Sequence, residues 1–99
     1  MHVNVHSIQF KADVKLLDFI EGRLHKLEQF HDKLIGAEVF LKIEKNAQLG
    51  NKVAEIKVHL PGKELFAKRQ SASFEESTDQ VVEALRRQIR RSKGKTAMV

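Results

Sequence analysis

The first part of the chain changes from a strand pattern to a helix pattern. Val3 and Val5 alternate with polar residues, which predicts a half-buried strand near the N-terminus. Apolar residues then recur at helical spacing, and Asp13 stands before them as a candidate N-cap. This spacing predicts a helix over about residues 14–30. Its apolar stripe consists of Leu16, Leu17, Ile20, Leu24, Leu27 and Phe30.

In the middle of the chain the apolar positions recur every second residue, which is typical of strands. The alternation predicts three further strands, over about residues 37–44, 54–60 and 64–70, with turn residues at 46–51 and 61–63 between them. Consecutive antiparallel strands are the simplest arrangement of this segment. The positions that we assign to the core are Ala37, Val39, Leu41, Ile43, Ala54, Ile56, Val58, Leu60, Leu65 and Ala67.

A second helix begins at a capping-box motif, Ser73-Phe74-Glu75-Glu76. In such a motif Ser73 accepts a hydrogen bond from the amide of Glu76, and the Glu76 side chain reaches back to the amide of Ser73. We expect this helix to end near Ser92 or Gly94. Its apolar stripe consists of Phe74, Val81, Leu85 and Ile89, with Val82 or Ser77 beside them.

The predicted order of elements is β-α-β-β-β-α, which belongs to the α+β class. Each helix has one apolar face, so the economical packing places both helices on one face of a four-stranded sheet. A chain of 99 residues with a hydrophobic fraction of 41% is sufficient for one core and one domain. We assign this domain to residues 1–95 and expect a short disordered tail at 96–99.

The composition excludes several classes of protein. No apolar run approaches the roughly 20 residues of a transmembrane helix, and the N-terminus lacks the pattern of a signal peptide. The chain has no cysteine, which excludes disulfides and thiolate metal sites. We therefore expect a cytoplasmic protein with no membrane partner. The net charge of +5 favours a polyanionic partner such as nucleic acid.

The positive charge is concentrated at the end of the second predicted helix. No acid follows Leu85, whereas the preceding helical turns carry acids and no bases. Acids at the start of a helix and bases at its end interact favourably with the helix dipole, which explains part of this arrangement. The dipole effect, however, fades within one turn. Arginines four residues apart on a helix repel each other. Keeping this unfavourable spacing indicates that the arginines bind an external anion. The bases are Arg86, Arg87, Arg90, Arg91, Lys93 and Lys95, and Arg23, Lys26 and Lys33 near the end of the first helix would widen the basic surface.

Nothing in the sequence indicates catalysis. His2, His6 and His59 share the sheet face turned away from the helices, but no carboxylate ligand stands at an obvious spacing, so exposed histidines are the favoured interpretation. There is no glycine-rich phosphate loop, serine nucleophile elbow or Cys–His pair. We predict no enzyme activity, no cofactor, no metal site and no small-molecule substrate.

Phe40 and Phe66 belong to the same sheet face as these histidines. We expect the two rings to cover each other or lysine stems, rather than to form an RNA-stacking platform.

Three segments follow one another in a characteristic order: His25-Lys26-Leu27-Glu28-Gln29-Phe30, Leu41-Lys42-Ile43-Glu44-Lys45, and the capped helix that leads to Arg86-Arg87-Gln88-Ile89-Arg90-Arg91. In order and spacing they resemble the short form of the ribosome hibernation promoting factor family, also called ribosome-associated inhibitors or sigma-factor modulation proteins. The resemblance implies a fold similar to double-stranded-RNA-binding domains. It also implies binding to the small ribosomal subunit and its rRNA, where the protein would block the channel for mRNA and tRNA in non-growing cells.

The resemblance maps the basic positions of the family onto Arg23, Lys26, Arg87, Arg91, Lys93 and Lys95 as RNA-binding residues. Arg86 and Arg90 join this set on charge alone, and Arg69, at an inward position, has no assigned role. We expect the free protein to be monomeric. Two other interpretations remain open. One is a general double-stranded nucleic-acid-binding protein, and the other is a protein-interaction module that modulates a transcription factor.

Overall fold

The order of elements predicted from the hydrophobic pattern is confirmed. The computed structural model describes the backbone of residues 1–45 and 50–97 and the side chains of residues 1–45 and 50–91. The elements are β1 (His2–Ser7), α1 (Val14–Leu27), β2 (Gly36–Ile43), β3 (Lys52–Leu60), β4 (Lys63–Ser71) and α2 (Phe74–Ala97). The predicted turn at 46–51 falls largely outside the described residues. No helix in the described part of the chain is long and apolar enough to cross a membrane.

The four strands form one mixed sheet in the order β1-β2-β3-β4. β1 and β2 are parallel neighbours, and α1 forms the crossover between them. β2, β3 and β4 are consecutive antiparallel strands, as predicted. β1 comes very close to β2 at Gly36, where a Cβ atom would lie 2.9 Å from the carbonyl oxygen of His2. This register position therefore requires a glycine.

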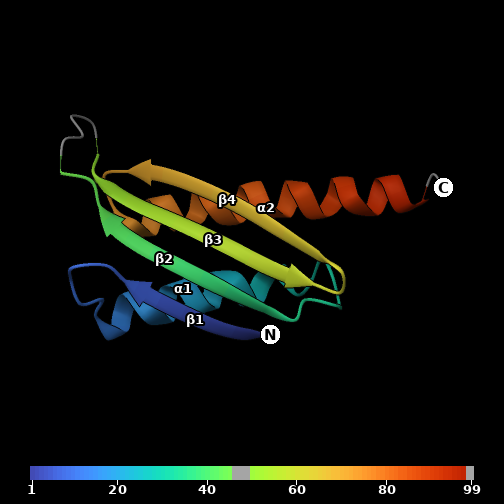
Figure 1. Cartoon of the computed structure of the whole chain (residues 1–99), viewed down its shortest axis with the longest axis horizontal. Coiled ribbons are helices and arrows are strands. Elements are labelled where there is room, and N and C mark those ends of the chain that lie inside the picture. The colour runs from blue at the N-terminus through green and yellow to red at the C-terminus, as the bar shows by residue number, and fades with distance from the viewer. Residues whose placement is uncertain (46–49, 98–99) are drawn as a thin grey trace.

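Both helices pack on the same face of the sheet, as predicted, and the other face is left without a covering layer (Figure 1). The core lies between the sheet and the helices. The predicted inward positions of β2, β3 and β4 are buried, except Ile43, which is 40% exposed at the end of β2. The helices contribute the buried side chains Leu16, Ile20, Leu24, Leu27, Phe74, Val81, Leu85 and Ile89. The α+β architecture is confirmed, whereas the implied similarity to double-stranded-RNA-binding domains stays a prediction.

α1 begins as predicted and ends earlier than predicted. The side chain of Asp13 accepts a hydrogen bond from the amide of Leu16 at 2.9 Å, which confirms the N-cap. The helix ends at Leu27 because the following amides bond to carbonyls three positions back instead of four. The amide of Phe30 donates to the carbonyl of Leu27 at 2.9 Å. This tight turn leaves the Phe30 side chain 37% exposed.

α2 begins with half of the predicted capping box. Ser73 Oγ accepts a hydrogen bond from the amide of Glu76 at 3.1 Å. The amide of Ser73 donates to Ser71 Oγ at 3.4 Å, where the capping box would have used the Glu76 side chain. Ser71 Oγ also lies 2.7 Å from the buried hydroxyl of Ser77, which donates to the carbonyl of Lys52 at 2.6 Å. This network joins the start of α2 to the adjacent ends of β3 and β4.

α2 is longer than predicted. Its backbone continues to Ala97, past the expected end near Ser92 or Gly94 and into the predicted tail at 96–99, of which residues 98–99 lie outside the described residues. The C-terminal turns of α2 extend beyond the end of the sheet (Figure 1). Arg86, Arg87 and Arg90 lie on turns that also carry the buried core residues Leu85 and Ile89, so these bases are held against the body of the domain.

Candidate nucleic-acid interface

The predicted RNA-binding residues come from two helices that pack against each other behind the sheet (Figure 1). Those with described side chains are Arg23 and Lys26 on α1 and Arg86, Arg87, Arg90 and Arg91 on α2. Lys93 and Lys95 also belong to α2, but their side chains lie outside the described residues. The fold thus brings the two predicted groups of bases onto one helical layer, although they are far apart in the sequence.

A hollow of about 390 Å³ lies between the two helices, and we call it the interhelical groove. Its lining mixes basic, acidic and apolar side chains: Arg23, Lys26, Leu27, Phe30, Asp79, Val82, Glu83 and Arg86. Arg23 Nε lies 2.8 Å from Asp79 Oδ1, and this ion pair bridges α1 and α2. The guanidinium carbon of Arg23 also lies 4.7 Å from the centre of the Phe19 ring. Arg23 is therefore engaged within the protein, which the sequence did not predict.

Arg86 is held by an acid one turn earlier on the same helix. Its Nε donates to Glu83 Oε2 at 3.1 Å, and one of its terminal nitrogens donates to Glu83 Oε1. The hydrogen bond from Arg86 holds the pKa of the Glu83 carboxyl below its ordinary value, against the smaller effect of desolvation. The same hydrogen bond raises the pKa of Arg86. The guanidinium carbon lies 5.6 Å from the centre of the Phe30 ring, so Arg86 also covers this aromatic side chain.

Arg87 is more weakly paired and more exposed than Arg86. Its Nε lies 3.7 Å from Glu83 Oε1, and 62% of its side chain is exposed. A second hollow, of about 350 Å³, is lined by Arg69, Asp79, Gln80, Glu83 and Arg87. Arg69, to which the sequence assigned no role, therefore lies beside the middle of α2, in a hollow that Arg87 also lines. The sequence could have pointed to Arg69, because an arginine stands there at a position that the alternation assigns to the interior, in a strand at the edge of the sheet.

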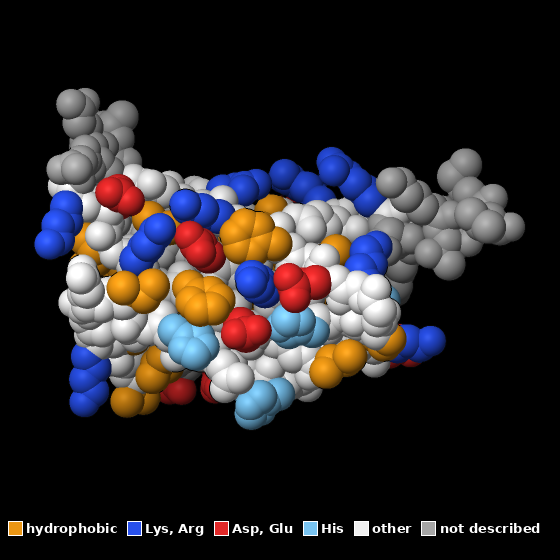
Figure 2. Space-filling model, in the orientation of Figure 1, with side chains coloured by type: hydrophobic (Ala, Val, Ile, Leu, Met, Phe, Trp, Pro, Cys, Tyr) orange, Lys and Arg blue, Asp and Glu red, His pale blue; other side chains and the backbone are white. Residues whose placement is uncertain are grey.

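Arg90 and Arg91 are exposed and have no ion-pair or hydrogen-bond partner among the described residues. Lys26 on α1 is likewise exposed and unpaired within that part of the chain. Figure 2 shows Lys and Arg side chains gathered along the edge of the molecule over α2. These three residues can bind an external anion without giving up an internal contact.

The outer face of the sheet carries histidines (pale blue in Figure 2), as predicted. β1 pairs with β2 and not with β3, so Gly36 separates His2 from His59. His59 lies between two carboxylates, with Nε2 3.1 Å from Glu38 Oε1 and Nδ1 3.2 Å from Glu64 Oε2. Within the described residues, no group of three or more candidate ligands could hold a metal ion.

The two phenylalanines of this outer face differ in their surroundings. The Phe40 ring stacks on His6, with the ring centres 4.9 Å apart and an angle of 14° between the planes. Phe66 is 46% exposed, and the described residues show no ring contact between it and Phe40. Of the two predicted alternatives, a contact between the phenylalanines is therefore wrong, because β3 lies between their strands and His6 stacks on Phe40. That the rings cover lysine stems stays a prediction.

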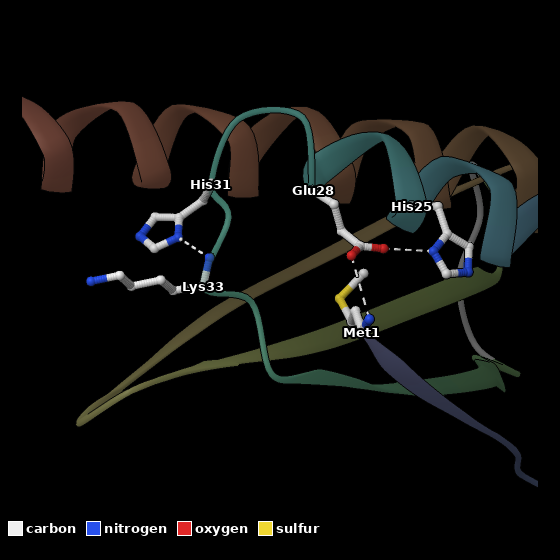
Figure 3. Close-up of polar contacts among 5 residues, drawn as sticks. All are labelled: Met1, His25, Glu28, His31 and Lys33. Atoms are coloured by element: carbon white, nitrogen blue, oxygen red, sulfur yellow. Dashed lines mark hydrogen bonds and ion pairs between the residues drawn. The ribbon is translucent and has the colours of Figure 1, made fainter.

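Glu28 holds the end of α1 against β1 (Figure 3). His25 Nδ1 lies 2.7 Å from Glu28 Oε1, and the amino group of Met1 lies 3.4 Å from Glu28 Oε2. The pKa of the Glu28 carboxyl is lowered, chiefly by the hydrogen bond with His25 and also by the amino group. In the following loop the amide of Lys33 donates to His31 Nδ1 at 3.0 Å. Lys33 thus belongs to this loop and not to a helical surface.

Comparison with known proteins identifies the family. A family model described as "Sigma 54 modulation protein / S30EA ribosomal protein" matches residues 3–97. The chain belongs to this family. A relative from Klebsiella oxytoca, named ribosome hibernation promoting factor, is 27% identical over 95 residues, which cover 96% of this chain and 96% of the relative. A protein of the same name from Escherichia coli K12 is 25% identical over 95 residues, with 96% of each chain covered.

Two solved structures share the fold of this S30EA family member. The crystal structure of the N-terminal domain of Thermus thermophilus Protein Y aligns with a TM-score of 0.80 at 24% identity, and covers 92% of this chain and 98% of that one. A ribosomal subunit interface protein from Coxiella burnetii aligns with a TM-score of 0.85 at 22% identity, and covers 95% and 99%. The family predicted from the sequence is therefore confirmed, together with its fold.

Proposed function

We propose that this chain is a ribosome hibernation factor that binds the small ribosomal subunit and inhibits translation in non-growing cells. Its membership of the S30EA family supports the proposal. Relatives named ribosome hibernation promoting factor support it as well, over nearly the whole chain. A protein of the same fold is described as a ribosomal subunit interface protein. The proposed location is the cytoplasm, where ribosomes work.

The observation that carries the proposal is the set of exposed, unpaired bases Lys26, Arg90 and Arg91 on two neighbouring helices. A guanidinium binds two phosphate oxygens at once, and each phosphate contact releases counterions from the RNA. Arg90 and Arg91 follow the buried Ile89 along α2, and their exposed side chains can contact RNA beside the helix. This geometry suits a binding site formed by folded rRNA.

The proposed mechanism is steric and involves no covalent step. The bound domain occupies the channel through which mRNA and the anticodon ends of tRNA pass, so translation cannot begin while it stays there. The phosphate contacts determine how long the protein remains bound. Because salt ions compete with such contacts, we expect the inhibition to weaken as the ionic strength rises.

Sedimentation with purified ribosomal particles tests this function. The protein is mixed with small subunits, large subunits or complete ribosomes at about 50 mM and about 200 mM monovalent salt. We expect it to sediment with small subunits and complete ribosomes at low salt and to be released at the higher concentration. Absence from every ribosomal fraction at low salt would show that the proposed function is wrong.

Two competition experiments distinguish the proposed function from general duplex binding and test the proposed binding site on the small subunit. An excess of long duplex RNA displaces a general binder but should leave a hibernation factor on the small subunit. Prior loading of the subunit with mRNA and tRNA should reduce binding, because these molecules occupy the proposed channel. Binding that is unchanged by mRNA and tRNA would contradict the proposed site.

A further inference from the structure

Arg86 differs from an arginine that is free to bind a phosphate. Two of its donor nitrogens already bind the carboxylate of Glu83. Its guanidinium carbon lies 5.6 Å from the centre of the Phe30 ring, and 30% of its side chain is exposed. Glu83 occupies the edge formed by Nε and one terminal nitrogen, so a phosphate can reach only the remaining terminal N–H groups, and the flat face of the guanidinium is also left for an external ligand.

Phe30 is the aromatic partner of this arginine. The tight turn after Leu27 takes Phe30 out of the apolar stripe and places it in the lining of the interhelical groove. The core is shielded from solvent without Phe30, since the side chains of Leu24 and Leu27 are only 0% and 1% exposed. A partly exposed aromatic ring next to a guanidinium, on a basic surface, is the arrangement that stacks on unpaired RNA bases.

We propose that Phe30 and Arg86 form a stacking site for one unpaired base of RNA. This inference rests on the proposed function and adds a second kind of contact to it. Glu83 fixes the guanidinium with two hydrogen bonds, so Arg86 loses little further freedom when a base stacks on it. The interhelical groove gives the base a space of about 390 Å³ with Leu27 and Val82 in its lining.

The charges of the groove are largely paired with each other. Asp79 pairs with Arg23 and Glu83 with Arg86, so these two arginines are less available to a phosphate than Lys26 in the same lining, which is unpaired within the described part of the chain. A nucleobase is neutral, and its amino and imino groups donate hydrogen bonds that a carboxylate accepts. The phosphates of the same strand would then lie near Arg90 and Arg91, which follow Arg86 along α2 and have no partner among the described residues.

Variants that conserve charge distinguish stacking from phosphate binding. The affinity for purified small subunits is measured over a range of salt concentrations for the wild type and for Phe30→Leu, Phe30→Tyr and Arg86→Lys. We expect Phe30→Leu and Arg86→Lys to weaken binding at least about fivefold, with an unchanged slope of log affinity against log salt. Phe30→Tyr keeps the aromatic face and should bind like the wild type. Arg91→Ala provides the contrast, because losing a phosphate contact makes the slope shallower by about 0.7–0.9.

Phe66→Leu is the matched control. Phe66 is a phenylalanine with 46% exposure on the opposite face of the sheet, so its replacement should leave the affinity unchanged. The double variant Phe30→Leu/Arg86→Lys should lose less affinity than the two single losses predict together, because both residues belong to one platform. Urea unfolding of each variant verifies that the fold is intact.

The stacking site and the proposed function fail in different ways. If the wild type does not bind small subunits, the proposed function is wrong and the stacking site falls with it. If the wild type binds and Phe30→Leu and Arg86→Lys bind equally well, the stacking site is wrong and the proposed function stands. Full affinity in Arg86→Lys, with a weaker and less salt-dependent affinity in Arg86→Ala, would show that Arg86 contacts phosphate instead.

Discussion

Arg23 of α1 forms an ion pair with Asp79 of α2, with Nε and Oδ1 2.8 Å apart. The pair lies in the interhelical groove, where Glu83 engages Arg86 in a similar way. The surface that we propose to bind RNA therefore contains its own acids, which neutralise part of its positive charge in the free protein. An RNA phosphate must compete with Asp79 for Arg23, so this acid lowers the affinity of the surface for a polyanion.

Replacing Asp79 with Asn should strengthen binding to small ribosomal subunits. The change removes a negative charge and leaves Arg23 available to phosphate, so we expect a gain of up to about fivefold at low salt. The two side chains are 37% and 50% exposed. For such a solvated pair, the free energy of unfolding should fall by less than about 1 kcal/mol.

The Asp79→Asn prediction is checked by titrating small subunits with labelled protein and by urea unfolding. Glu75→Gln is the matched control, because it removes the same charge from the first turn of the same helix. A gain in affinity that is equal in the two variants would show that net charge alone is responsible. Weaker binding by Asp79→Asn would show that Asp79 supports the interface instead of competing with it.

Removing Arg87 and Arg91 together should weaken binding and flatten its salt dependence. Both side chains are exposed on α2, four residues apart, so the fold should not change. Two lost phosphate contacts should make the slope of log affinity against log salt shallower by about 1.4–1.8. The control Lys11→Ala/Lys15→Ala removes the same charge near the start of α1, away from the basic turns of α2. Equal affinities for the wild type and the Arg87→Ala/Arg91→Ala variant would exclude these arginines from the interface.

The strands, helices and core could be predicted because their signals are local. The alternation in β3 assigns Ile56 and Val58 to the interior, and both are fully buried. An N-cap acts on an amide three residues later, so Asp13 and Ser73 could be identified from the sequence alone. The length of α1 was not predicted correctly, because periodicity does not show where a tight turn replaces the last helical turn.

The partners of the basic residues were harder to predict, for two different reasons. The contact between Arg23 and Asp79 depends on how α1 packs beside α2, which no local pattern contains. Glu83 and Arg86 stand three residues apart, a spacing at which helical side chains meet, so this pair was accessible from the sequence. It was missed because the acidic and basic halves of the helix were interpreted as separate groups.

Acid should destabilise the protein through Glu28. The hydrogen bond with His25, together with the amino group of Met1, holds the pKa of the Glu28 carboxyl below its ordinary value of 4.5. Because the folded pKa is lower than the unfolded one, the ionised carboxylate stabilises the fold above about pH 4.5. This contribution is lost as the pH falls through the lower, folded value.

Glu28→Gln removes this contribution and so provides the measurement. The free energy of unfolding, obtained from urea unfolding, should differ most between the wild type and Glu28→Gln near about pH 6, and the difference should shrink towards about pH 3. Glu21→Gln, on the same helix, gives the effect of losing an exposed carboxylate without an ion pair among the described residues. A difference between wild type and Glu28→Gln that stays constant over this range would contradict the prediction.

Two glycines should respond to alanine in opposite directions. Gly22 lies in α1, and apart from its chain neighbours and the backbone of its own helix, a Cβ atom there would meet nothing within 4 Å. Alanine loses less backbone freedom on folding than glycine, so Gly22→Ala should raise the free energy of unfolding by about 0.5–1 kcal/mol. At Gly36 the added Cβ would lie 2.9 Å from the His2 carbonyl oxygen, which belongs to the backbone of β1 and cannot rotate away.

Gly36→Ala should therefore push β1 away from β2 and lower the free energy of unfolding by about 1–3 kcal/mol. Urea unfolding of the wild type and both variants, with the same slope against urea concentration, measures the two effects on one scale. A loss of stability in Gly22→Ala would show that α1 is not helical at this residue. Wild-type stability in Gly36→Ala would show that β1 and β2 do not approach each other as closely as the structure has them, since the added methyl carbon would lie only 2.9 Å from the His2 carbonyl oxygen.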